Sequence, residues 1–65
     1  MKRVGFKEWL EAVKTLMVRT KIIKPDIELD SDSWKAYYDE GLNVFDTVVA
    51  EFGLDFKRRF IKTLN

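Results

Sequence analysis

Apolar residues recur every three or four positions along most of this chain, and the pattern is interrupted at Pro25, Gly41 and Gly53. This spacing places side chains on one face of an α-helix, whereas a strand would alternate every second residue. Proline and glycine are typical of helix ends. The pattern therefore predicts an all-α fold, a compact bundle of three to four short helices over about residues 5–20, 33–40, 43–52 and 55–64.

The longest helix is expected over residues 5–20, and the acidic stretch after it is expected to be a connector. Pro25 disfavours the helical conformation at Lys24, so the helix ends before this point. The connector covers residues 25–33 and finishes in side chains that cap helices, directly before Trp34. These cap candidates are Asp30, Ser31, Asp32 and Ser33.

The two later glycines divide the C-terminal half into three short helices. Gly41 and Gly53 offer the left-handed conformation in which many helices end. Asn43 is expected to cap the third helix, and Asp55 to cap or charge the first turn of the fourth. The apolar stripe of the fourth helix is Phe56, Phe60, Ile61 and Leu64.

The composition of the chain argues against an enzyme. Its 65 residues suffice for a single domain, residues 1–65, with a small core and marginal stability. The absence of cysteine and histidine excludes disulfides, thiol chemistry and most zinc sites. The acids at positions 26, 28, 30 and 32 lack the glycine and closing glutamate of a calcium loop, and the adjacent Asp39 and Glu40 do not face each other on a helix. We expect no catalytic group, metal or cofactor.

The charges are segregated along the chain although the net charge is only +1. Residues 1–24 carry seven basic and two acidic groups, residues 25–51 one basic and eight acidic groups, and residues 52–65 four basic groups and one acidic group. Two interpretations follow. The acidic middle pairs with the basic ends inside the fold, or the separated charges steer association with charged partners.

Acidic and aromatic residues occur together in the second helix and its approach. Trp34 is expected in the core with Trp9, whereas Tyr37 and Tyr38 differ in direction by about 100°, so one of them should lie at the boundary. Six residues are therefore candidates for a protein-binding surface. They are Asp30, Asp32, Tyr37, Tyr38, Asp39 and Glu40.

Two stretches resemble the helix-turn-helix, a DNA-binding motif of two helices joined by a turn that often contains glycine. In the first, around Gly41, the second helix carries acids and no basic residue. The second stretch covers about a third of the chain, residues 44–64, although Val49 stands where the family usually has a smaller residue. The resemblance implies nucleic-acid binding through the cations of the last helix. These cations are Lys57, Arg58, Arg59 and Lys62.

We expect a small non-enzymatic adaptor or inhibitor that docks on a larger protein. So many large apolar residues are difficult to bury in 65 residues, which makes a homo-oligomer a further expectation. The alternative is a small nucleic-acid-binding protein that uses the helix at residues 55–64. No membrane span and no targeting segment are expected, and the cytoplasm is the expected location, that of the host if the chain is viral.

Overall fold

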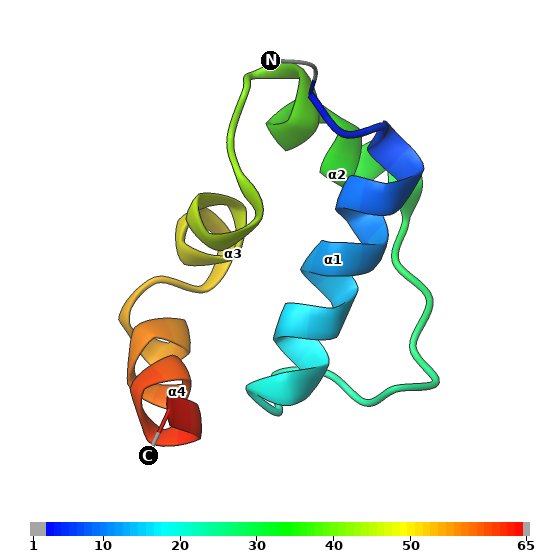
Figure 1. The fold of residues 1–65 in the computed structure, drawn as a ribbon. Helices are drawn as coiled ribbons and strands as arrows, with labels where there is room; N and C mark the ends of the chain where they lie inside the picture. Colours follow the sequence, from blue (N-terminus) through cyan, green and yellow to red (C-terminus); the bar gives the residue numbers. More distant parts are fainter. Residues whose placement is uncertain (1–2, 65) are drawn as a thin grey trace.

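Four helices follow one another along the chain in the computed structural model, which describes residues 3–64 (Figure 1). They are α1 (Phe6–Arg19), α2 (Ser31–Asp39), α3 (Val44–Phe52) and α4 (Leu54–Leu64), and no strand occurs among the described residues. The all-α prediction is confirmed. The bounds of α1, α3 and α4 lie within one residue of those predicted from the sequence.

Helix α2 begins two residues earlier than predicted, because Asp30 is its N-cap. One oxygen of the Asp30 carboxylate accepts from the backbone N–H of Asp32 at 3.2 Å, and the other accepts from the hydroxyl of Ser33 at 2.9 Å. The acidic connector is therefore shorter than residues 25–33, and Asp32 lies in the first turn of α2. A carboxylate there faces the positive end of the helix dipole.

Left-handed residues follow both α1 and α2. Gly41 has a φ of 90° after α2, as predicted. The corresponding residue after α1 is Lys21, with a φ of 62°. The next N–H, that of Ile22, donates back to the carbonyl of Met17 at 2.9 Å, the pattern of a Schellman ending. The sequence pattern did not indicate that this lysine turns the chain.

Helix α1 is central, since it packs against α2 and α3, while α4 packs against α3. Two threonines, Thr20 and Thr47, are also buried, and their hydroxyls donate to carbonyls one turn earlier, at Leu16 and Asn43. Hydrogen bonding thus removes the cost of burying these hydroxyls. The buried apolar core consists of Trp9, Val13, Met17, Val48 and Phe56.

Two expectations about burial hold only in part. Trp9 is buried, and its indole N–H donates to the carbonyl of Leu42 at 3.1 Å, whereas Trp34 packs against the core but is only partly buried. The predicted stripe of α4 also divides. Phe56 and Phe60 face the core, whereas Ile61 and Leu64 are largely exposed.

Candidate functional site

Tyr38 belongs to an aromatic cluster at the N-terminal end of α1. Its ring lies 5.4 Å from each of the Phe6 and Trp9 rings, edge to face, and its hydroxyl donates to the carbonyl of Val4. The guanidinium of Arg3 lies 3.7 Å from the ring centre on a face of the same ring. The ring and hydroxyl of Tyr38 are therefore engaged within the fold.

Tyr37 is likewise engaged, because its hydroxyl donates to the carboxylate of Glu51 on α3. This hydrogen bond raises the pKa of Tyr37 above its ordinary value of 10.0, and burial and the negative charges of Glu51 and Glu40 act in the same direction. The bond joins α2 to α3. Both tyrosines proposed for a binding surface thus hold helices together, although each remains partly exposed.

The four acids of that predicted surface are all exposed. Asp30 caps α2, Asp32 lies in its first turn, and Asp39 and Glu40 lie at its C-terminal end. These carboxylates form no ion pair within the described residues. The face of α2 therefore offers free negative charge but little free aromatic area.

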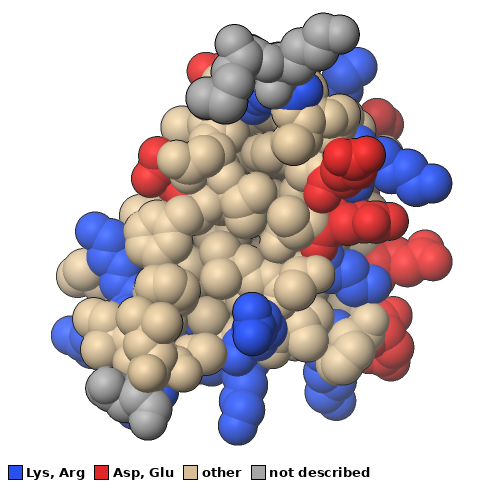
Figure 2. All heavy atoms as spheres, viewed as in Figure 1, with Lys and Arg blue, Asp and Glu red and all other residues tan. Residues whose placement is uncertain are grey.

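The segregated charges do not meet inside the fold. Within residues 3–64 the one ion pair joins Arg59 to Asp55, 3.1 Å apart on the same helix, and no ion pair joins the acidic middle to the basic ends. Figure 2 shows acidic side chains mainly along the right of the view and basic ones around its lower end. The structure therefore does not show the internal pairing that was one of the two interpretations.

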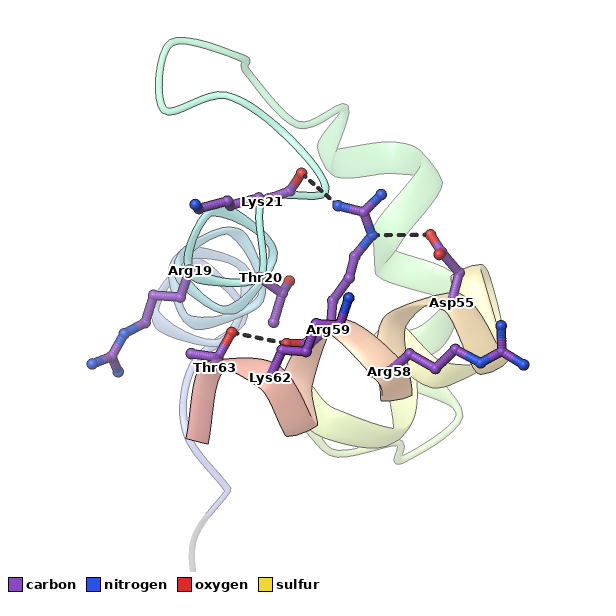
Figure 3. Close-up of a pocket in the computed structure, with 8 residues that line it drawn as sticks. All are labelled: Arg19, Thr20, Lys21, Asp55, Arg58, Arg59, Lys62 and Thr63. Carbon is purple, nitrogen blue, oxygen red and sulfur yellow. Dashed lines mark hydrogen bonds and ion pairs between the residues drawn. The ribbon is translucent and has the colours of Figure 1, made fainter. Parts of the chain in front are cut away.

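A basic hollow of about 450 Å³ lies between the end of α1 and helix α4 (Figure 3). Arg59 crosses it, with Nε on Asp55 and Nη1 on the carbonyl of Lys21 at 3.2 Å, so this cation is committed to holding α4 against α1. The other cations around the hollow make no hydrogen bond to a described residue, so their charge remains available. The lining consists of Arg19, Thr20, Lys21, Asp55, Arg58, Arg59, Lys62 and Thr63.

An apolar hollow of about 530 Å³ adjoins the basic one and lies between α1, α3 and α4. Arg19 lines both hollows. Phe45 packs edge to face on Phe56 and Phe60, with ring centres 5.3 and 5.1 Å apart, and is still 38% exposed. The apolar hollow is lined by Ala12, Thr15, Leu16, Arg19, Val44, Phe45 and Phe60.

Among the described residues, the most exposed large aliphatic side chains lie on α4. Leu54, Ile61 and Leu64 are 70%, 59% and 71% exposed. Their spacing of seven and three places them on one stripe with Lys57, and Arg58 and Lys62 follow along one edge. We call this surface the α4 face. It consists of Leu54, Lys57, Arg58, Ile61, Lys62 and Leu64.

The sequence pattern indicated the cations of this face but not its apolar stripe. Ile61 and Leu64 were assigned to the core, and Leu54 was assigned no role. The available signal was the spacing of Leu54 and Ile61, which lie on the opposite side of the helix from Phe56, whereas Leu64 lies at the edge of the stripe, nearer to Phe60. Arg19 and Lys21, distant in sequence from α4, join it only in three dimensions.

The geometry does not support the resemblance to a helix-turn-helix. Gly53 alone joins α3 to α4, with φ 64° and ψ −138°, whereas that motif uses a turn of about three or four residues. The turn between α2 and α3 has a suitable length, but Asp46 and Glu51 on α3 are acidic. Neither of these two helix pairs combines a turn of the required length with a basic second helix.

Comparison with known proteins adds no functional assignment. No family model matches this chain, and no curated protein or solved structure matches it significantly. Within residues 3–64, no helix has the length and apolar character needed to cross a membrane. Among the same residues, no three acidic side chains converge on a position for a metal ion. The exposed surfaces of the domain are therefore the basis for a functional proposal.

Proposed function

We propose that this chain is a small non-enzymatic binding domain, an adaptor or inhibitor, that docks on a larger protein through the α4 face. The observation that carries the proposal is the stripe of Leu54, Ile61 and Leu64, each more than half exposed. Single exposed aliphatic residues are ordinary, but several on one helix face are typical of interaction sites. The stripe is not part of the core, to which α4 contributes Phe56 and, packed against it, Phe60.

The face is also held in place before binding. Phe56 anchors α4 in the core, and Arg59 ties it to the end of α1 through the Lys21 carbonyl. A surface that is already ordered loses less conformational entropy on binding. Arg58 lies beside the stripe, and arginine is enriched at energetically dominant interface positions.

The acidic face of α2 supports a second role in the same proposal. Asp32, Asp39 and Glu40 are exposed and form no ion pair within the described residues. They therefore favour approach to a basic surface of the partner, and they affect the rate of association more than the affinity of the complex. Asp30, Tyr37 and Tyr38, the other candidates on this side, have structural contacts. The proposed setting remains the cytoplasm, that of the host if the chain is viral.

Site-specific photocrosslinking in the source cells tests the proposal. A photoreactive residue at Ile61 should give protease-sensitive adducts larger than the chain, because the α4 face is covered by the partner. The matched control is the same residue at Glu8, which is exposed on α1. Protein adducts from position 8 with none from position 61 would contradict the assignment of the face.

The second candidate function is nucleic-acid binding, favoured by the free cations of α4. Lys57, Arg58 and Lys62 make no ion pair within the described residues, as contacts to phosphates require. Fluorescence anisotropy with a labelled duplex and a labelled single strand tests this candidate. Tight binding at physiological salt, with a salt slope that falls by about one after Arg58→Ala, would replace the first proposal.

A further inference from the structure

A third hollow, on another part of the molecule, has the opposite character to the α4 face. It has a volume of about 220 Å³ and lies between α1 and the connector. Leu10 and Leu29 give it an apolar lining, Glu11 and Glu28 give it negative charge, and Lys14 is its one lining cation. We call it the acidic hollow.

The acidic hollow and the α4 face complement each other. The face presents exposed Ile61 and Leu64 beside three cations, and the hollow presents apolar side chains beside two carboxylates. Neither set of charges has an ion-pair partner within the described part of its own chain. Two further exposed acids, Asp26 and Asp30, lie within two residues of Glu28 in the sequence.

Charge also decides against the simplest symmetric pairing. In a symmetric dimer, the α4 face of one copy would pack on the α4 face of the other. Lys57, Arg58 and Lys62 of each chain would then lie opposite the same cations of the other chain. Juxtaposed like charges oppose association. A second copy that offers its acidic hollow instead brings unlike charges together and covers apolar side chains on both sides.

We propose that the chain associates head to tail, with the α4 face of one copy on the acidic hollow of the next. Such a heterologous contact leaves one free face and one free hollow at the ends, so it grows into open chains unless its rotation closes a ring. A larger partner would compete with the second copy for the α4 face. The inference goes beyond the proposed function and does not depend on it.

Sedimentation velocity of the purified chain tests this association. The average mass should rise with protein concentration in about 0.02 M salt and return to the 7.7 kDa of one chain in about 0.5 M salt, because added ions screen exposed charges. Lys14→Glu should strengthen the association by removing the one cation of the hollow. A chain that stays monomeric at low salt overturns the proposal, and so does a closed dimer that persists when the charges of the face or of the hollow are reversed.

Paired charge reversals test the two sides of the contact. Arg58→Glu with Lys62→Glu reverses the face, and Glu11→Lys with Glu28→Lys reverses the hollow. Each double variant alone should associate at least about tenfold more weakly than the original chain. An equimolar mixture should assemble again, because the reversed face of one meets the reversed hollow of the other. A mixture that stays monomeric contradicts the contact.

Controls with the same net charge separate this contact from general electrostatics. Asp39→Lys with Glu40→Lys and Lys7→Glu with Lys35→Glu change exposed residues outside both surfaces, so each should assemble like the original chain. Weakening equal to that of the paired reversals would overturn the specific contact. Ile61→Ser with Leu64→Ser should weaken assembly while the circular dichroism stays helical, since both residues are exposed. Unchanged assembly of this last variant would equally overturn the proposal.

Discussion

Lys21 adopts a left-handed backbone conformation at the end of α1, with a φ of 62°. A side chain in this conformation costs about 1–2 kcal/mol, and glycine avoids that cost but gains freedom in the unfolded chain. Lys21→Gly should therefore raise the free energy of unfolding by up to about 1 kcal/mol in urea titrations. Lys24→Gly, at an exposed position without positive φ, is the control and should not stabilise. A lower free energy of unfolding in Lys21→Gly would contradict the proposed backbone strain at Lys21.

The two tryptophans should differ in their contribution to stability. Trp9 is 2% exposed and its indole N–H is hydrogen-bonded to Leu42, so Trp9→Ala should cost about 3–5 kcal/mol. Trp34 is only partly buried, and Trp34→Ala should cost about half as much. Urea unfolding of both variants measures the difference. Equal losses would place Trp34 in the core, as the sequence first suggested.

Tyr37 couples stability to alkaline pH through its hydrogen bond to Glu51. Because this bond raises the pKa of Tyr37 in the folded state, the contribution of Tyr37 to the free energy of unfolding is fully present below its pKa in the unfolded chain, about 10. It is lost as the pH rises through the folded pKa. Glu51→Gln should lower the pKa of Tyr37, as measured by tyrosinate absorbance. Tyr37→Phe should lose less stability than the original chain from about pH 9 to pH 11.

At the scale of the element, α2 depends on its cap as well as on the packing of its aromatic side chains. The helix has no fully buried residue, and Asp30 satisfies its free N–H end. Asp30→Ala should destabilise the domain by about 0.5–2 kcal/mol, and Asp30→Asn should retain most of the stability. Asp26→Ala, in the connector, should have little effect. If Asp30→Ala leaves the melting temperature unchanged in thermal unfolding, another residue caps the helix.

The same helices show what local sequence can and cannot predict. Gly41 and Asn43 were identified because a helix end needs a left-handed residue and a helix start needs a side-chain acceptor. Asp30 was not distinguished from the three similar residues after it, since the choice depends on backbone geometry. Ile61 was misplaced because periodicity identifies an apolar face but does not say which neighbour covers it. The basic hollow, in which Lys21 lies near α4, forms by packing between segments that are distant in the sequence, so local sequence does not predict it.

At the scale of the whole molecule, charge contributes little to the fold despite its segregation. The one ion pair within residues 3–64 is exposed and joins residues of a single helix. Exposed pairs contribute about 0–1 kcal/mol, so the free energy of unfolding should change by less than about 1 kcal/mol when salt screens them. Urea titrations at low and high salt, at concentrations that keep the chain monomeric, measure this. A large loss in high salt would indicate internal pairing of the acidic middle with the basic ends.

The core also determines when this chain can fold during its synthesis. Trp9, Val13 and Met17 come from the first helix, whereas the other buried apolar residues, Val48 and Phe56, come from α3 and α4. The ribosome delivers the N-terminal residues first. The apolar side of the first helix therefore stays partly uncovered until α3 and α4 have left the ribosome. This domain can complete its core only after its fourth helix has been synthesised.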